Sequence, residues 1–314
     1  MQCSCKICGN TKSNEQYIFE EKMYATGDSF DYFQCSACKT LQICSIPDNL
    51  GMYYPDSYYN SKIKFIASLR NSLRLKRDHH SYGKKNFLGK ILVEKIGANC
   101  NTAAFRWIQK IINPAHDCKI LDVGCGPGNF LLFLDSLGFK NLTGLDPFIQ
   151  KNNFMGKNKH IQIKKCQLEE LNGQYDLIIL NHSFEHMPNP QKAFNKLCSS
   201  IAPGGHILLR VPIVNWAWKH YRHNWVQIDA PRHIFIPSLK AIKILCRNNG
   251  AVAKKVKFDS NAFQFIGSKK YSKGIALNDH LPITNKQKKN YEEQAVDLNK
   301  IQQGDQVCFI IAKN

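Results

Sequence analysis

A glycine-rich turn directly after an apolar segment constrains the fold of this chain more than any other feature. The stretch ILDVGCGPGNF, residues 120–130, carries Asp122 near the end of the apolar segment and glycine at positions 124, 126 and 128. Residue 129 is asparagine, so the pattern differs from the GxGxxG of dinucleotide-binding proteins, and no Gly-Lys-Ser/Thr follows as in a P-loop. We expect a strand, a tight turn and a helix, and the turn would let a ligand lie against the backbone.

Strand-like and helix-like segments alternate from residue 119 onward. The predicted strands span 119–123, 141–146, 160–165, 175–180, 204–212, 251–258 and 306–312, and the predicted helices span 129–138, 189–201 and 238–250. Ser238 is expected to cap the last of these helices and Gly250 to end it. Such alternation predicts an α/β fold with a parallel sheet that is covered by helices on both faces.

An acidic residue ends the second predicted strand. Asp146 lies 18 residues after Gly128. A carboxylate at the carboxyl end of that strand can accept hydrogen bonds from both hydroxyls of a ribose. The turn and the acid together predict a site for a ribose-containing ligand.

Two pairs of cysteines near the N-terminus predict a metal site. The pairs are CKIC and CSAC, and 26 residues separate them. In a cytosolic chain, paired CxxC turns at this separation predict one tetrahedral zinc ion, which would stabilise a segment too small to form its own core. The predicted ligands are Cys5, Cys8, Cys35 and Cys38. Cys3 is a spare cysteine that could compete with them, and Cys44 lies just outside the second pair.

Composition and patterning suggest three regions: a zinc-ribbon-like module at 1–50, a helical linker or lid at 51–115, and a catalytic domain at 116–314. The linker carries three helical patterns among many basic residues, beginning at Ile63, Leu88 and Phe105. The formal net charge of +19 favours anionic partners or, equally, a solvated basic surface. No stretch reaches the ~20 apolar residues that span a bilayer, and no leader-like pattern opens the chain, so we expect a cytoplasmic protein.

Four motifs in order resemble those of class I S-adenosylmethionine-dependent methyltransferases: ILDVGCGPGNFL, LTGLDP, YDLIILNHSFEHMPNP and IAPGGHILLRVP. The resemblance covers about residues 118–312 and implies a Rossmann-like sheet of seven strands with the last antiparallel. It implies that Gly124, Gly126 and Gly128 line the methionine and ribose, that Asp122 orients the amino group, and that Asp146 holds the ribose. Asn181 would lie near the sulfonium. The family often places an acid after the third strand to bind adenine; here Gln167 occupies that region.

A narrower resemblance joins the N-terminal module to the rest. The stretches NWVQIDAPRHIFIPSLKAIKIL and DSNAFQFIGSKKY are similar to a bacterial, Methyltransferase-23-like subgroup that carries an N-terminal CxxC…CxxC module. Members of this subgroup are often associated with cell-surface polysaccharide or secondary-metabolite sugar pathways. The resemblance implies methyl transfer to a small acceptor, such as a sugar or polysaccharide precursor. The alternatives are an RNA methyltransferase that grips phosphates with its basic helices and zinc module, and a non-enzymatic S-adenosylmethionine-binding protein.

Three histidines are candidates for a general base that would deprotonate a hydroxyl acceptor. His182 and His186 flank Glu185 just beyond the fourth predicted strand, and His233 lies in the segment Val211–Pro237, which we expect to cover the methyl-transfer site. A two-histidine metal site at His182 and His186 is the less favoured interpretation, since HSFEH lacks the HExxH order of zinc proteases. The same segment carries four aromatic residues suited to stacking on a planar acceptor or to packing: Trp216, Trp218, Tyr221 and Trp225.

Overall fold

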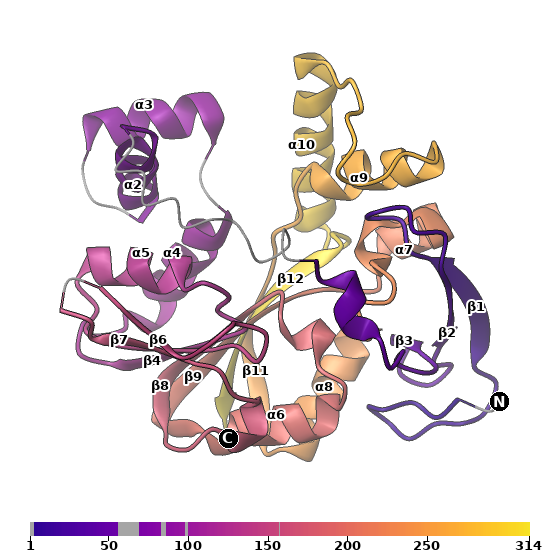
Figure 1. The fold of residues 1–314 in the computed structure, drawn as a ribbon, viewed down its shortest axis with the longest axis horizontal. Coiled ribbons are helices and arrows are strands. Elements are labelled where there is room, and N and C mark those ends of the chain that lie inside the picture. The colour runs from indigo at the N-terminus through magenta and orange to yellow at the C-terminus, as the bar shows by residue number, and fades with distance from the viewer. Residues whose placement is uncertain (1–2, 56–68, 83–85, 98–99, 157) are drawn as a thin grey trace. The chain divides into compact units, whose positions relative to one another are not determined.

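The computed structural model describes residues 3–55, 69–82, 86–97, 100–156 and 158–314. The chain divides into two compact units. The first unit combines Met1–Tyr53, His182–Cys198 and Leu209–Asn314, and the second combines Tyr54–Asn181 and Ser199–Leu208. The predicted linear division into 1–50, 51–115 and 116–314 stays a prediction. Figure 1 labels the helices and strands.

Parallel strands form the centre of the second unit. Strand β4 (Lys119–Val123) pairs in parallel with β5 (Asn141–Leu145) and β8 (Tyr175–Asn181), and β5 pairs in parallel with β7 (Ile161–Lys164). The side chains of β4 and β8 are mostly apolar and buried, as expected for strands that are covered on both faces. These four strands confirm the predicted segments. A short antiparallel strand, β6 (Asn153–Met155), pairs with β7 and was not predicted.

The full sheet has eight strands in the order β11-β12-β9-β8-β4-β5-β7-β6. Strand β9 spans Ile201–Pro212, β11 spans Ala251–Phe258, and β12 spans Gln306–Lys313. The last two strands pair antiparallel, from Ala251 opposite Lys313 to Phe258 opposite Val307. The sheet confirms the predicted Rossmann-like methyltransferase fold class, including its antiparallel last strand.

Helices of the second unit follow the predicted patterns. Helix α5 (Asn129–Leu137) starts after Gly128 and ends at Gly138, whose left-handed conformation lets its N–H bond two carbonyl groups of the last turn. The basic linker forms α2 (Leu69–Tyr82), α3 (Phe87–Ile96) and α4 (Cys100–Ile112). The start of the first predicted linker pattern, at Ile63 and Ile66, lies outside the described residues.

The N-terminal part of the first unit is a small sheet, drawn in indigo in Figure 1. Its order is β1-β2-β3-β10, and every pairing is antiparallel. Strands β1 (Glu15–Glu20), β2 (Ser29–Gln34) and β3 (Leu41–Ile43) belong to the N-terminal module, whereas β10 (Phe235–Ile236) comes from the connection after β9. The pairing of β3 with β10 was not predicted, and it makes the connection part of the same sheet as the module.

Helices complete the first unit. Ser238 caps α8 (Leu239–Asn248) by accepting a hydrogen bond from the Ala241 N–H at 3.1 Å, and Gly250 follows the helix end, as predicted. The short 3₁₀ helix η3 spans Phe184–His186 and leads into α6. The other helices are α6 (Pro190–Ser199), α7 (Trp216–Tyr221), α9 (Phe263–Ser272) and α10 (Asn285–Lys300). No helix within the described part of the chain is both long and apolar enough to span a membrane.

Candidate functional site

The glycine turn of the second unit needs its glycines for two different reasons. Gly124, Gly126 and Gly128 all have positive φ angles, of 76°, 51° and 83°. A Cβ atom on Gly128 would collide with Cδ1 of Ile163 and approach Sδ of Met155, so these side chains would have to move to admit one. A Cβ atom on Gly126 would have no neighbour within 4 Å. The backbone at Gly126 therefore faces open space in which a ligand can lie against it.

Two buried carboxylates flank this turn. The Asp146 carboxylate accepts hydrogen bonds from the N–H groups of Gly126 and Phe148, both at 2.9 Å, while burial raises the pKa of Asp146. Burial and the nearby charge of Asp146 raise the pKa of Asp122 to about 7. A cationic ligand group beside these carboxylates would relieve the cost of their ionisation. The turn thus combines an open backbone with a preference for positive charge.

The remaining predicted cofactor residues lie at the same edge of the sheet. Asn181 ends β8, whose Leu180 is in register with Val123 of β4. Gln167 is exposed and lies just after β7, where it precedes a short 3₁₀ helix. The carboxyl ends of parallel strands form the ligand-binding edge of an open α/β sheet. The structure brings all seven predicted cofactor residues to this edge of the second unit.

The three predicted histidines meet at one carboxylate in the first unit. Glu185 is fully buried, and its Oε1 accepts a hydrogen bond from Nδ1 of His182 at 3.1 Å and lies 3.9 Å from Nε2 of His233. Burial by itself would raise the pKa of Glu185, but the His182 hydrogen bond and the three nearby imidazoles outweigh it and lower the pKa to about 2. We call His182, Glu185, His186 and His233 the imidazole cluster.

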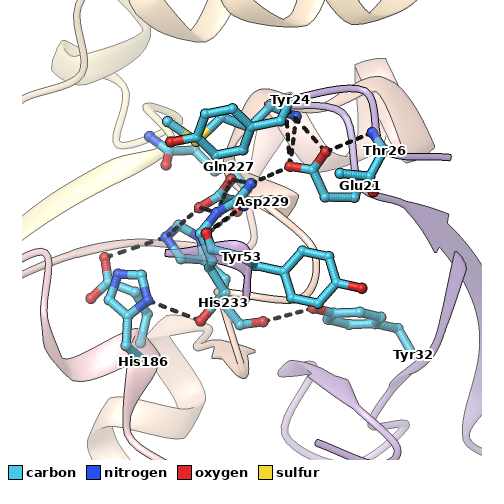
Figure 2. A network of polar contacts seen from close by, with 12 residues as sticks. Glu21, Tyr24, Thr26, Tyr32, Tyr53, His186, Gln227, Asp229 and His233 are labelled. Atoms are coloured by element: carbon cyan, nitrogen blue, oxygen red, sulfur yellow. Dashed lines mark hydrogen bonds and ion pairs between the residues drawn. The ribbon is translucent and has the colours of Figure 1, made fainter. Parts of the chain in front are cut away.

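Backbone carbonyl groups fix the orientation of two rings in this cluster. Nδ1 of His186 donates to the Arg232 carbonyl oxygen at 2.9 Å, and Nδ1 of His233 donates to the Gln227 carbonyl oxygen at 2.7 Å. Because a carbonyl oxygen only accepts, each neutral ring carries its proton on Nδ1 and its lone pair on Nε2. The two rings meet edge to face, with their centroids 4.8 Å apart and their planes inclined by 67°; both residues are labelled in Figure 2. Burial and the neighbouring His233 lower the pKa of His186 to about 4, which keeps it neutral.

Part of this cluster has the composition of a metal site. Glu185, His186 and His233 each offer a ligand atom within 4.8 Å of the others. Oε2 of Glu185 is buried and has no hydrogen-bond partner among the described residues. Metal-binding imidazoles commonly donate their other N–H to a carbonyl oxygen, as both rings do here. The structure therefore groups His186 with His233, whereas the sequence alternative paired it with His182.

The four N-terminal cysteines meet as predicted. Their sulfur atoms all lie within 4.8 Å of one another, with 3.5 Å between Cys5 and Cys38 and 3.5 Å between Cys8 and Cys35. Zinc–sulfur bonds of ~2.3 Å place tetrahedral sulfurs about 3.8 Å apart, so the four thiols fit a zinc ion. A hydrogen bond from Cys38 lowers the pKa of Cys5 to about 5, which favours a thiolate at that position.

Two of the four aromatic residues in the connection after β9 are core residues. Trp218 and Trp225 are 2% and 0% exposed. Trp218 packs edge-on against Tyr17 and Phe19, and the Trp225 indole N–H donates to Asp305 at 2.9 Å. Their faces are covered by protein, so packing is the better interpretation for this pair. Trp216 instead stacks on His220, with centroids 4.5 Å apart.

Sequence reasoning missed the charged residues that support His233. Arg232 is fully buried and pairs with Glu21 and Asp229, each at 2.7 Å. The only signal in the sequence was an arginine within the otherwise apolar stretch around His233. Its partner Glu21 is 211 positions away, a separation at which no local pattern indicates a contact.

Residues 71–254 match a family model described as a methyltransferase domain, Methyltransf_23. This match covers more than half of the chain. The chain belongs to the class I S-adenosylmethionine-dependent methyltransferase family. S-adenosylmethionine is therefore the cofactor that membership implies for the glycine turn.

Curated relatives agree with this family. A ubiquinone biosynthesis O-methyltransferase from Dechloromonas aromatica is 28% identical over 120 residues, which are 35% of this chain and 50% of that protein. One from Rickettsia typhi is 28% identical over 207 residues, 54% of this chain and 82% of that protein. The chain spans about half the length of the first curated relatives it matches.

Among solved structures, a geranyl diphosphate C-methyltransferase from Streptomyces coelicolor is 13% identical, with a TM-score of 0.47, and the match covers 75% of this chain and 88% of that chain. A likeness this distant supports no conclusion of its own.

Proposed function

We propose that this methyltransferase transfers the methyl group of S-adenosylmethionine to a hydroxyl oxygen of a small-molecule acceptor. The observation that carries the proposal is the ionised, buried Glu185, which holds the ring of His182 directly after Asn181, the last residue of β8. Asn181, which we assign to the cofactor, and His182, which we assign as the base, are therefore consecutive residues at the carboxyl end of β8.

The cofactor is assigned to the glycine turn. The methionine and ribose would lie along Gly124, Gly126 and Gly128, where the backbone at Gly126 is open. The buried carboxylate of Asp122 suits the ammonium group, because a cation there offsets the cost of ionising it. Asp146 would hold the ribose hydroxyls through the lone pairs that its two backbone hydrogen bonds leave available.

The other two residues complete the cofactor assignment. Asn181 would contact the methionine end near the sulfonium, since it ends the strand next to β4. Gln167 would accept a hydrogen bond from the adenine amine through its amide oxygen. Its exposed position after β7 leaves the side chain able to reach a ligand at that edge.

Among the three candidate bases, the geometry favours His182. Its Nδ1–H is bonded to Glu185, so Nε2 carries the lone pair, and the carboxylate stabilises the imidazolium that forms when Nε2 takes a proton. The side chain of His182 is 29% exposed, whereas that of His233 is 8% exposed and His186 is held neutral by a pKa of about 4. His182 would therefore take the proton from the acceptor hydroxyl.

When bound, S-adenosylmethionine supplies an electrophilic methyl group whose thioether leaving group needs no acid. The protein's contribution is to hold the acceptor oxygen in line with the methyl and to remove its proton. Positioning of this kind is worth up to ~7–11 kcal/mol in favourable cases. General-base assistance adds roughly 10²–10⁴-fold in rate.

The acceptor class rests on the relatives. The curated relatives carry names for O-methylation in ubiquinone biosynthesis, which is a small-molecule reaction. These names do not support the predicted sugar or polysaccharide acceptor, which stays a prediction, as does the RNA alternative suggested by the net charge of +19. A phenolic or other hydroxyl acceptor is the class we propose.

A structural zinc ion is the second element of the proposal. Cys5, Cys8, Cys35 and Cys38 would hold it, because their sulfur atoms already lie at distances close to those of a tetrahedral site. The ion would tie the two cysteine turns together and so stabilise β2 and β3 on either side of the second turn.

A divalent cation at Glu185, His186 and His233 is a second candidate for acceptor activation. The unpartnered Oε2 of Glu185 favours it. Such a cation would lower the pKa of a bound hydroxyl and reduce the need for a base. Loss of turnover after treatment with EDTA, with recovery on adding Mg²⁺, Mn²⁺ or Zn²⁺ to the zinc-replete protein, would favour this mechanism over His182 alone.

The test is transfer of a labelled methyl group from S-adenosylmethionine to a panel of phenols, quinols, glycosides and RNA. We expect labelling of a small hydroxylated compound and not of RNA. With that acceptor, His182→Gln should lower kcat by roughly 10²-fold or more and leave S-adenosylmethionine affinity unchanged. His223→Gln, which alters an exposed histidine of the same unit, is the control. Wild-type kcat in His182→Gln would show that the base lies elsewhere.

A further inference from the structure

A fully buried arginine lies next to the candidate acceptor site. Arg232 is 0% exposed, and burying its charge is costly unless that charge is paired and fully hydrogen-bonded. The guanidinium meets this requirement. Nε lies 3.1 Å from both carboxylate oxygens of Asp229, Nη2 lies 2.7 Å from Asp229 and 2.7 Å from Glu21, and Nη1 donates to the Tyr53 carbonyl oxygen at 3.1 Å.

Two partners of Arg232 come from the N-terminal part of the first unit: Glu21, in the module, and Tyr53, just after it. Glu21 is 1% exposed, and its two oxygens also accept hydrogen bonds from the backbone N–H groups of Met23, Tyr24 and Thr26. The ring of Tyr24 packs 5.4 Å from the guanidinium. Figure 2 shows this part of the network around Glu21, Tyr24 and Thr26. These backbone hydrogen bonds orient the Glu21 carboxylate independently of Arg232.

On the other side, the same short segment carries the imidazoles. The Arg232 carbonyl oxygen accepts the Nδ1–H of His186, and the next residue is His233. The backbone N–H of His233 donates to the Asp229 carbonyl oxygen at 3.1 Å. The Tyr32 hydroxyl of β2 donates to the His233 carbonyl oxygen at 2.9 Å, as Figure 2 shows. Residues 229–233 are thus held by the module at one side and hold two rings at the other.

We propose that Arg232 is a positioning residue through which the N-terminal module sets the orientation of His186 and His233. In this arrangement the module supports residues 229–233 through the hydrogen bonds of Glu21 and Tyr32. The inference rests on the proposed function, because that function assigns to the acceptor His182, which is bonded to Glu185, and Glu185 lies beside the rings of His186 and His233.

These contacts indicate which substitutions should break the connection between the N-terminal module and the rings of His186 and His233. Glutamine at position 21 keeps one oxygen, but its NH₂ group would face a backbone N–H or the guanidinium, because both oxygens of Glu21 are acceptors. Lysine at position 232 loses the planar fork that reaches Asp229, Glu21 and Tyr53 together. Glu20 is the matched control, since it is exposed and is the last residue of β1, directly before Glu21.

The experiment combines kinetics with ¹⁵N-histidine NMR on the full, zinc-replete chain. In the wild type, the Nδ1 protons of His186 and His233 should be hydrogen-bonded and slow to exchange with solvent. In Glu21→Gln and Arg232→Lys they should shift and exchange faster, and kcat should fall roughly 10- to 100-fold with S-adenosylmethionine affinity within twofold of wild type. Glu20→Gln should match the wild type in every measurement.

A milder variant keeps the test decisive if those two proteins do not fold. Tyr32→Phe removes only the hydroxyl that bonds the His233 carbonyl oxygen, and the expected result is a His233 signal that shifts with a several-fold loss of kcat. Wild-type imidazole signals and wild-type kcat in the folded variants would overturn the proposal. If the wild type shows no methyl transfer, the proposed function fails, but the imidazole signals still decide whether Arg232 positions the rings.

Discussion

Replacing Asp122 by asparagine should change how the stability of the protein depends on pH. Asp122 is 4% exposed, and burial together with the charge of Asp146 raises its pKa from 3.8 to about 7. A carboxyl group whose pKa is higher in the folded state favours folding below its unfolded pKa, and this contribution is lost as pH rises through the folded pKa. The wild type should therefore lose stability between about pH 4 and pH 7 because of this residue.

The size of this pKa shift sets how much unfolding free energy the wild type loses. About three pKa units correspond to about 4 kcal/mol of unfolding free energy above pH 7, and roughly 2–3 kcal/mol of that is lost between pH 5 and pH 8. Asp122→Asn carries no charge and should not show this loss. A buried amide without a full set of partners costs ~1–3 kcal/mol at every pH, so the informative quantity is the change with pH and not the absolute stability.

Urea unfolding, followed by circular dichroism at pH 5, 6, 7 and 8 without cofactor, measures this quantity. The difference in unfolding free energy between Asp122→Asn and the wild type should move in favour of the variant by roughly 2–3 kcal/mol from pH 5 to pH 8. Subtracting the wild-type values removes the other titrating groups. A difference that stays constant over this range would refute the idea that Asp122 carries a desolvation penalty which a cationic ligand group can relieve.

Substitutions at two glycines test the turn, and one at Cys5 tests the cysteine site. Gly128 has a φ of 83°, and a Cβ there would collide with Ile163, so Gly128→Ala should lower the unfolding free energy by ~1–3 kcal/mol. Gly126 has a φ of 51° and no neighbour for a Cβ, so Gly126→Ala should lose less stability but should weaken S-adenosylmethionine binding. Equal losses of stability in the two variants would contradict this prediction. Elemental analysis of the wild type should give about one zinc ion per chain, and Cys5→Ser should lower this zinc content, while the control Cys118→Ser should not. A wild-type N-terminus that is metal-free but resistant to protease would count against the site.

The sheet and the cofactor edge were predictable because their signals are local. The central strands β4 and β8 are short, mostly apolar segments, and the residue that follows each parallel strand along the chain lies at the carboxyl edge by geometry. The glycine turn and Asp146 therefore meet as expected: Asp146 directly follows β5, and its carboxylate accepts a hydrogen bond from the Gly126 N–H.

The acceptor side was less predictable because its contacts are distant in sequence. Strand β10 is only two residues long, Phe235–Ile236, and nothing in its pattern indicates pairing with β3. The ion pair of Arg232 with Glu21 could not be predicted for the same reason, because the two residues are 211 positions apart in the sequence. The histidines could be proposed from their chemistry, but their order of preference came from Glu185, whose burial and single bonded oxygen only the fold reveals.

Calorimetric titration of S-adenosylmethionine into the wild type and Asp146→Ala tests the central claim most directly. We predict binding of one cofactor per chain to the wild type. In Asp146→Ala, binding should be weaker by roughly 1.5–3 kcal/mol, the range for hydrogen bonds to a charged group. No binding to the wild type, or equal affinity in the two proteins, would contradict the assignment of the glycine turn and Asp146 as the cofactor site.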